Sequence, residues 1–536
     1  MRDIQRTALK IGDGKNWRFA GGKWVDGDDG LIAVREDQLR APSEGMQGLH
    51  FAFHRNLCFQ DCKASFEICL AYASDLGIIL RARDDSHFYL LHFHNCAQQS
   101  RAQHFWATLS MMDETGYLTP VKNELVRRVP SNLDTWLPVE VELIGRRILV
   151  RVGDYGYFEA EDDTYPGPGH VGIFMGSRGR DIFIPQMRNV VVEGVPEPVS
   201  HTQDSGAQAK NWFYPVPTDD QTWQMPTGLL RFPDGELLLS YHSEIKDENW
   251  NNEEEIRAIA HCITRSSDGG RSWSEPEQGF EGASHLTPAG RFIRLIKQEE
   301  NYGIMESLDR GRTWSDPVPT NLDHNKGFGP ILNLEDGSMV AFAYGSHELK
   351  DDNLATWTWG SHHCHAFSAR SDDDGLTWSD PVNVDTPGFD KEGVQLEGNL
   401  DLTELSPMQL ASGRLMVFIR PIYSPWMWET WSDDGGRSWG PCVRGPFPGY
   451  ASPNVVRTAS GALLVAHRMP WLTVHCSQDE GRTWRGTMID SGAWAMGGMR
   501  EVEPDLVLYC YWDSFESLMR MQFIRVTPSG LEPVSI

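Results

Sequence analysis

The sequence predicts an all-β protein, in which a six-bladed β-propeller follows a β-sandwich with a jelly-roll-like arrangement. Three observations predict this fold class: a recurring eight-residue motif, paired apolar segments before each copy of it, and alternating apolar residues in the N-terminal part. We expect the sandwich at 1–197, a linker at 198–212 and the propeller at 213–536. A chain of 536 residues exceeds an ordinary domain of about 100–200 residues.

The recurring motif reads Ser-x-Asp-x-Gly-x-Ser/Thr-Trp. It occurs at Ser266–Trp273, Ser307–Trp314, Ser371–Trp378, Ser432–Trp439 and Ser477–Trp484. The starting positions are 41, 64, 61 and 45 residues apart, close to the roughly 40–50 residues of a four-stranded blade. Glycine accepts the positive φ of a tight turn, and Asp and Ser side chains bind nearby backbone N–H groups. We therefore expect five structural turns, with the tryptophans packed between sheets.

Each blade also contains an apolar strand, a turn and a second apolar strand. The expected pairs are Met225–Phe232 with Glu236–Tyr241, His285–Leu286 with Arg291–Ile296, Gly329–Leu334 with Ser338–Ala343, Leu405–Leu410 with Arg414–Ile419, Asn454–Thr458 with Ala462–Ala466, and Ala495–Val502 with Leu506–Tyr511. The sixth pair lacks the motif, which is common in terminal repeats. Upstream, segments such as Val139–Leu143 alternate at period two, as strands of a sandwich do.

Composition limits the function. The net charge of −27 disfavours nucleic acid and anionic membranes as partners, and no apolar run approaches the roughly 18 residues of a membrane span. The N-terminus does not resemble a secretory signal, so a cytoplasmic location is expected, or a secreted one if a signal has been removed. Nine irregularly spaced cysteines indicate free thiols in a reducing compartment. No metal or other cofactor is expected.

The five motifs resemble the Asp boxes, or BNR repeats, of the sialidase (neuraminidase) superfamily. The segment Gly169–Gly194 resembles the closing strands of a concanavalin- or laminin-G-like jelly roll. In sialidases the box joins the third and fourth strands of a blade, at the rim away from the active site. The resemblance therefore implies a site at the other end, formed by residues before each inner strand and by loops between second and third strands.

The segment 401–420 resembles the sialidase segment in which a glutamate is followed by a glycine turn and by an arginine that ends the next strand. The resemblance implies that Glu404 polarises a nucleophile and that Arg420 binds a substrate carboxylate. Arg468 resembles the next carboxylate-binding arginine of the family. An arginine fork matches a planar carboxylate.

The sequence departs from the family pattern in blades one and six. Gln224 stands where the family has its first arginine, and Trp494 lies in the segment where the family has its tyrosine nucleophile. Asp247 is nearest to the family's acid/base aspartate. The candidates are thus Glu404, Asp247 and His285 for catalysis, and Gln224, Arg420, Arg468, Trp223, Trp426 and Trp494 for substrate binding, the tryptophans as stacking surfaces for sugar rings.

Each candidate also has a structural interpretation. Glu404 can cap backbone groups, the arginines can pair with rim carboxylates, His285 can be a polar channel residue, and Asp247 lies in an acidic loop. Three functions stay open: an exo-acting hydrolase that removes a terminal acidic sugar, a lyase acting by β-elimination at a uronic acid, and a non-catalytic glycan-binding protein. The expected partner is an acidic glycan or oligosaccharide, and a homo-oligomer stays open.

Overall fold

The computed structural model describes residues 3–12, 14–20, 23–34, 49–69, 74–94, 104–127, 135–177, 186–198, 211–218, 222–245, 259–280, 284–323, 327–345, 365–385, 402–421, 426–449, 453–468, 471–490, 493–513 and 518–535. The chain forms two compact units, Met1–Lys210 with Gly486–Gly492, and Asn211–Arg485 with Ala493–Ile536. Within the described ranges, no helix is long and apolar enough to cross a membrane.

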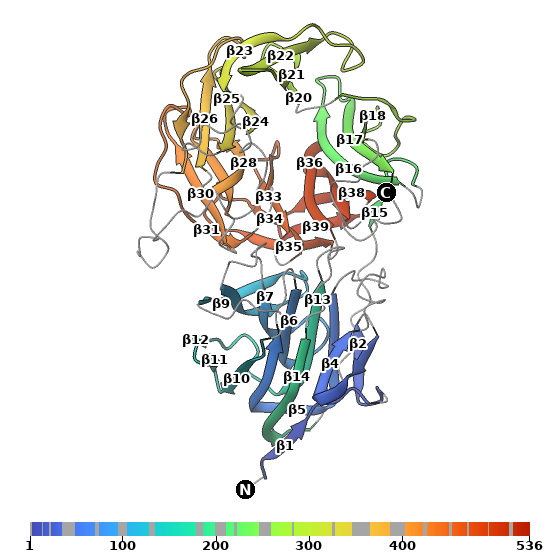
Figure 1. Ribbon diagram of the computed structural model, residues 1–536, viewed down its shortest axis with the longest axis vertical. Helices are drawn as coiled ribbons and strands as arrows, with labels where there is room; N and C mark the ends of the chain where they lie inside the picture. Colours follow the sequence, from blue (N-terminus) through green and yellow to red (C-terminus); the bar gives the residue numbers. More distant parts are fainter. Residues whose placement is uncertain are drawn as a thin grey trace. The chain divides into compact units, whose positions relative to one another are not determined.

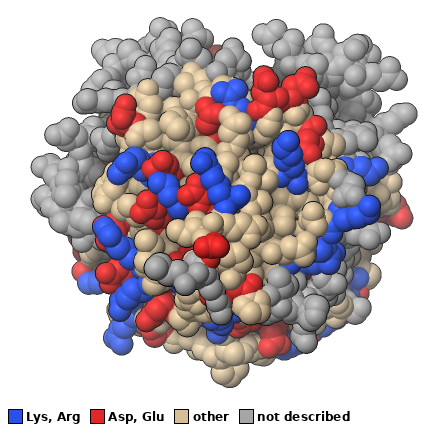
Figure 2. Space-filling model, turned by 90° about the horizontal axis from the view of Figure 1, so that it is seen from below, with Lys and Arg blue, Asp and Glu red and all other residues tan. Residues whose placement is uncertain are grey.

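In the described part of the first unit, 14 strands enclose a large apolar core. They are β1 (Gln5–Ala8), β2 (Trp17–Ala20), β3 (Trp24–Asp26), β4 (Leu31–Val34), β5 (Leu49–Cys69), β6 (Ser74–Ala82), β7 (Phe88–His94), β8 (His104–Met112), β9 (Leu118–Arg127), β10 (Leu137–Ile144), β11 (Arg147–Val152), β12 (Gly156–Glu161), β13 (Gly169–Ser177) and β14 (Gln186–Pro196), with a 3₁₀ turn η1 (Asp28–Gly30). Lysine and arginine lie interspersed with aspartate and glutamate on the face shown in Figure 2.

The long strand β5 divides this unit into two layers. Its first half pairs with β13 and β2, and its second half pairs with β10 and β14. The core lies between the layers, where Phe66 of β5 meets Phe93 of β7 with ring centroids 6.2 Å apart. Alternate residues of β10, such as Val139 and Val141, enter this core, as the period-two pattern predicts.

The second unit is a six-bladed propeller (Figure 1). Blade one is β16 (Thr222–Arg231), β17 (Leu237–Ile245), β18 (Ile259–Ser266), β19 (Glu277–Gln278); blade two is β20 (Ser284–Leu286), β21 (Phe292–Lys297), β22 (Asn301–Ser307), β23 (Val318–Asp323); blade three is β24 (Gly327–Asn333), β25 (Met339–Gly345), β26 (His365–Ser371), β27 (Val382–Asn383). Blade four is β28 (Leu402–Gln409), β29 (Leu415–Pro421), β30 (Trp426–Ser432), β31 (Val443–Pro448); blade five is β32 (Asn454–Arg457), β33 (Leu463–Arg468), β34 (Leu472–Ser477), β35 (Arg485–Asp490). The predicted all-β fold class is confirmed.

Blade six combines both ends of the propeller sequence. It contains β36 (Ala493–Glu503), β37 (Leu506–Asp513), β38 (Leu518–Thr527) and β39 (Gly530–Val534), and β15 (Trp212–Phe213) pairs with β38 as well. Trp212 lies opposite Gln522 and Phe213 opposite Met521. Because β15 precedes blade one in the chain, this pairing closes the ring.

The five motif segments, here called the repeat turns, have one hydrogen-bond pattern. In the first, Asp268 Oδ1 accepts hydrogen bonds from the Ser266 hydroxyl and from the backbone of Ser272, while Ser266 Oγ accepts the N–H of Gly270. The corresponding bonds recur in the other four. These bonds lower the pKa of Asp309 and of Asp479 to about 2. The repeat aspartates are committed to the turns.

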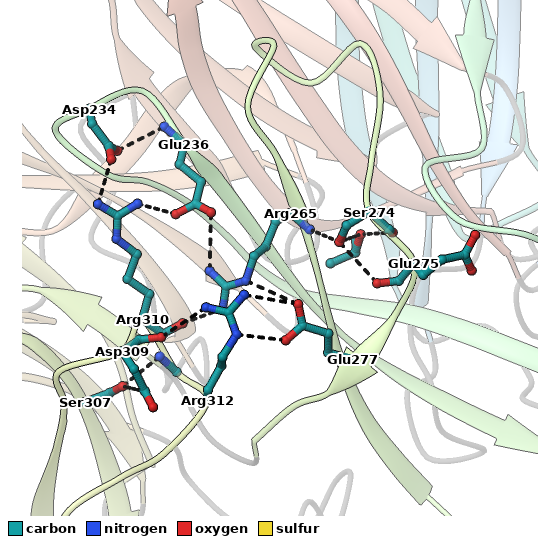
Figure 3. A network of polar contacts seen from close by, with 12 residues as sticks. Asp234, Glu236, Arg265, Ser274, Glu275, Glu277, Ser307, Asp309, Arg310 and Arg312 are labelled. Carbon is teal, nitrogen blue, oxygen red and sulfur yellow. Dashed lines mark hydrogen bonds and ion pairs between the residues drawn. The ribbon is translucent and has the colours of Figure 1, made fainter.

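The repeat turns and the turns after the inner strands lie at the same end of the propeller. Figure 3 shows Arg310, of the second repeat turn, binding Asp234 at 2.6 Å and also Glu236, both in the first turn of blade one. Arg312 binds Glu277 at 3.1 Å in the same network. Neighbouring blades are thus linked by ion pairs at this turn end, and the opposite end is free for a site.

Candidate active site

The end opposite the repeat turns, here called the site end, gathers the starts of the inner strands and the ends of the second strands. This follows from the antiparallel order of each blade. Gln224 lies near the start of β16, Glu404 near the start of β28, Arg420 near the end of β29, and Arg468 at the end of β33. The structure therefore places these four predicted residues at one end of the propeller.

Glu404 lies on a β-bulge. The pairing of β28 with β29 shifts between Thr403 and Leu405, so that Glu404 is the extra residue, and its φ is +37°. This left-handed region disfavours residues that have a Cβ atom. Bulges re-aim side chains and are frequent near active sites, where strained backbone also concentrates.

The bulge directs Glu404 toward Arg420. Glu404 Oε1 accepts a hydrogen bond from Arg420 Nη1 at 2.7 Å, and the two side chains are only 14% and 3% exposed. The second carboxylate oxygen, Oε2, is buried and has no hydrogen-bond partner among the described residues. A buried acceptor without a donor is costly, so this oxygen is suited to a hydroxyl group of a bound ligand or to water.

Gln224 has a similar half-satisfied side chain. Its Nε2 donates to the carbonyl of Pro217 at 2.9 Å, which fixes the orientation of the amide. Its Oε1 is buried and, in the described part of the chain, accepts no hydrogen bond. Gln224 therefore offers an acceptor to a ligand, whereas an arginine in this place would offer charged donors.

The other predicted binding residues lie at the same end with different degrees of burial. Arg468 is buried at 9% exposure. Trp223 is half-buried and lies edge-to-face with Trp512 at 5.4 Å. Trp426 is buried, and the guanidinium of Arg444 lies over its ring at 3.8 Å from the centroid. This cation–π contact is favourable, and Arg444 covers the face of the Trp426 ring that it meets.

His285 is positioned differently from these residues. It lies on the short strand β20, two residues before Thr287, whose hydroxyl binds Asp374 of a repeat turn at 2.8 Å. Its Nε2 bonds Asn333 Oδ1 at 2.7 Å. The structure therefore brings His285 to the turn end of its inner strand and does not bring it into contact with Glu404. Asp247 lies outside the described residues, and of Trp494 only the position on β36 is described.

No tyrosine of blade six replaces the family's nucleophile at the start of β36. Tyr509 and Tyr511 lie on β37 and are fully buried. Burial raises the pKa of Tyr509 well above its usual value, and its hydroxyl makes no hydrogen bond among the described residues. Neither hydroxyl is placed to attack a sugar.

Two ionic pairs at the site end were not predicted from the sequence. His365 Nδ1 bonds Asp385 Oδ2 at 3.0 Å, with the imidazole 31% and the carboxylate 6% exposed. Asp513, at the end of β37, pairs with Arg520 at 2.7 Å, and both are fully buried. The two residues of the first pair are 20 positions apart in the chain (385 − 365), and those of the second pair are 7 apart (520 − 513). Strand pairing brings the residues of each pair together. No described group of three or more His, Cys, Asp or Glu side chains could hold a metal ion.

No protein-family model matches this sequence, and no curated protein matches it. Among solved structures, a Hadza microbial sialidase, Hz136, is 16% identical with a TM-score of 0.43, over 88% of this chain and 94% of that chain. A variant of the NanB sialidase from Streptococcus pneumoniae is 10% identical with a TM-score of 0.41, over 94% and 98%. The carbohydrate-binding module CBM66 from Bacillus subtilis is 15% identical with a TM-score of 0.25, over 33% and 96%.

The six sheets of four or five strands and the closure through β15 make this unit a six-bladed β-propeller. A shared fold does not by itself determine the reaction that a protein catalyses. The reaction has to be argued from the residues at the site end.

Proposed function

We propose that the propeller is an exo-acting glycoside hydrolase that removes a terminal, carboxylate-bearing sugar from a glycan. The observation that carries the proposal is the buried Glu404–Arg420 pair on a strained bulge at the site end. A buried ion pair and a positive φ at a residue with a Cβ atom both lower the stability of the fold. Backbone strain of this kind is concentrated at functional sites.

In this proposal, some residues at the site end bind the sugar and others transfer protons. Arg420 and Arg468 bind the sugar carboxylate, and the acceptor oxygen of Gln224 binds a hydroxyl group. Glu404 acts as one member of a two-carboxylate pair through its unpaired Oε2, with Asp247 as the expected second member. The burial of Tyr509 and Tyr511 supports this two-carboxylate route over a covalent intermediate on tyrosine.

The test compares hydrolysis of sialosides and uronic-acid glycosides by the natural protein and by Glu404→Gln. Glutamine keeps the hydrogen bond to Arg420, so the fold is retained while proton transfer is lost. We expect kcat to fall by about 10²–10⁴-fold, the usual share of general acid–base catalysis. The matched control is Asp433→Asn, because Asp433 also pairs with an arginine of blade four, Arg414, but at the turn end.

Arg420→Gln, with Arg414→Gln as its control, tests carboxylate binding. We expect kcat/KM to fall by about 10–100-fold for the acidic glycoside, since a hydrogen bond to a charged group contributes about 1.5–3 kcal/mol. Unchanged turnover in Glu404→Gln would contradict the proposal for that residue. Glycan binding without any product would indicate the non-catalytic alternative.

A second candidate is β-elimination at a uronic acid, favoured by the His365–Asp385 pair at the site end. A buried carboxylate on Nδ1 orients the imidazole so that Nε2 faces away from it, as in a general base. The same assay discriminates the two reactions, because a lyase product is unsaturated and absorbs in the ultraviolet, whereas a hydrolase product does not.

A further inference from the structure

One position of the repeat turns has the same backbone conformation in all five copies but differs in residue type. This residue, here called position four, stands between the aspartate and the glycine of the motif and is Gly269, Arg310, Asp374, Gly435 or Glu480. Its φ lies between +58° and +75° in every copy. Glycine adopts this region without a steric cost, whereas a residue with a Cβ atom is strained there. Three copies nevertheless have a charged side chain at position four.

The side chain at position four of the second copy reaches the preceding blade. Arg310, of blade two, binds Asp234 at 2.6 Å and also Glu236 (Figure 3). Both carboxylates belong to the turn between the first and second strands of blade one, a turn here called the inner turn. Arg265 of blade one donates in the opposite direction, from Nη2 to the carbonyl of Arg310 at 2.7 Å. Position four thus joins two blades through its side chain and its backbone.

The other two charged residues at position four make the corresponding contact with different partners. Asp374, of blade three, accepts the Thr287 hydroxyl at 2.8 Å and the Ala289 N–H at 3.2 Å, both in the inner turn of blade two. Glu480, of blade five, accepts the N–H of Ala411 in the inner turn of blade four at 2.9 Å. In each copy that has a side chain at position four, this side chain therefore binds the inner turn of the preceding blade.

Where position four is glycine, an arginine supplies the link between the blades. Arg370 of blade three, which is buried, donates to the carbonyl of Gly435 in blade four at 2.8 Å and binds Asp336 of its own inner turn at 2.9 Å. A Cβ atom at Gly435 would approach this same Nη1 at 2.7 Å, so the arginine occupies the space of a side chain. In the first copy, Arg271 binds Glu503 of blade six at 2.5 Å.

The charges at position four match the inner turns that they meet. Arg310 faces two carboxylates, whereas Asp374 faces Arg291 of blade two, whose Nη1 lies 3.6 Å from the Asp374 carboxylate. A carboxylate in place of Arg310 would meet like charges in blade one, and an arginine in place of Asp374 would meet Arg291. Like charges placed together disfavour a wrong partner. Each of these inner turns is therefore complementary to its own neighbour and repels the opposite charge.

We propose that position four of the repeat turns is an inter-blade clasp, which fixes the blade that packs against each inner turn. The serine and aspartate of the motif close the turn itself, and position four joins the closed turn to the preceding blade. The contact offsets the strain of a positive φ, which explains why three copies do not have glycine there. This inference concerns the assembly of the ring and is independent of the proposed glycoside hydrolysis.

The first test replaces Asp374 or Glu480 by glycine in the whole protein and measures amide hydrogen exchange by mass spectrometry. Glycine removes the side-chain contact and the backbone strain together, so a side chain that is merely tolerated would give equal or slower exchange. We expect Asp374→Gly to speed exchange at 286–292, the inner turn of blade two, by about tenfold or more, because hydrogen bonds to a charged group are lost. Exchange at 409–415, the inner turn of blade four, should not change.

Glu480→Gly should have the reverse effect, with faster exchange at 409–415 and none at 286–292, so each variant is the control for the other. Unchanged exchange in both variants would overturn the proposal, as would a change of equal size in all blades.

The second test concerns charge complementarity. We expect Arg310→Glu to speed exchange at 232–237 more than Arg310→Gly does, and this excess should disappear when Asp234→Asn and Glu236→Gln are also present. Persistence of the excess would overturn the proposal. If Arg310→Glu alone does not fold, folding in the neutralised background would support the clasp, and failure in both backgrounds would refute it.

Discussion

Two turn glycines share one backbone conformation but differ in how much space a side chain would find at each position. Gly235 and Gly270 have φ values of +94° and +92°, and L residues rarely adopt that conformation. A Cβ atom at Gly235 would meet nothing within 4 Å, whereas one at Gly270 would approach Leu508 Cδ2 at 2.3 Å. Leu508 is fully buried, so a shift of its side chain has to displace the atoms packed around it.

The two glycines therefore make a matched pair for substitution by alanine. We expect Gly235→Ala to lower the free energy of unfolding by about 1–2 kcal/mol, from backbone strain alone. Gly270→Ala should cost about 1–3 kcal/mol more, because overpacking of the core adds to the strain. Denaturant unfolding of the two variants measures the difference, and equal losses would show that the Leu508 contact yields without cost.

Glu404 uses the same left-handed region without being glycine. Its bulge depends on how β28 and β29 are paired, and no local sequence signal marks that register. The family resemblance indicated the residue, but its contact with Arg420 and its unpaired oxygen follow only from the three-dimensional pairing.

At the scale of elements, the blades were predictable because each repeat turn is a local unit. Eight consecutive residues contain the donor, the acceptor and the glycine that the turn needs, and spacing alone then orders the strands. Contacts between blades were not predictable in this way. The His285–Asn333 hydrogen bond joins residues 48 positions apart, and neither sequence segment contains a signal that predicts this contact.

Blade five contains a buried pair of histidines that should make the propeller sensitive to acid. His467 Nε2 and His475 Nδ1 are 2.8 Å apart, and the ring of Phe447 stacks on His475 with centroids at 3.9 Å. Burial lowers the pKa of His467 to about 3, and burial and the neighbouring histidine lower that of His475 well below its usual value. In the unfolded chain both would titrate near 6.5.

Between about pH 6.5 and 3 the unfolded chain therefore binds protons that the folded blade excludes, so stability falls as the pH falls. Each histidine contributes a slope of up to about 1.4 kcal/mol per pH unit. We expect the double variant His467→Leu, His475→Leu to have a shallower loss of unfolding free energy between pH 6 and pH 4. Parallel pH profiles for the variant and the natural protein would show that the pair does not titrate on unfolding.

At the scale of the whole propeller, closure of the ring depends on a two-residue strand. β15 pairs with β38, Phe213 stacks on Phe523 at 5.9 Å, and the buried Arg520 lies over the ring of Trp212 at 3.9 Å. Arg520 in turn holds Asp513 of β37. Two aromatic side chains thus join the start of the propeller sequence to its last blade.

The double variant Trp212→Ala, Phe213→Ala removes the two aromatic contacts with β38 and leaves the backbone of β15 in the chain. Both side chains are half-buried, and full burial of such a side chain contributes about 1.5–3 kcal/mol, so we expect a loss of about 3 kcal/mol in propeller stability. Because loss of β15 leaves Met521 and Gln522 unpaired at that edge of β38, blade six should also become the first site of proteolysis. Leu308→Ala is the control, since Leu308 is 94% exposed. If the double variant unfolds like this control and resists protease equally, the other blade contacts close the ring without β15.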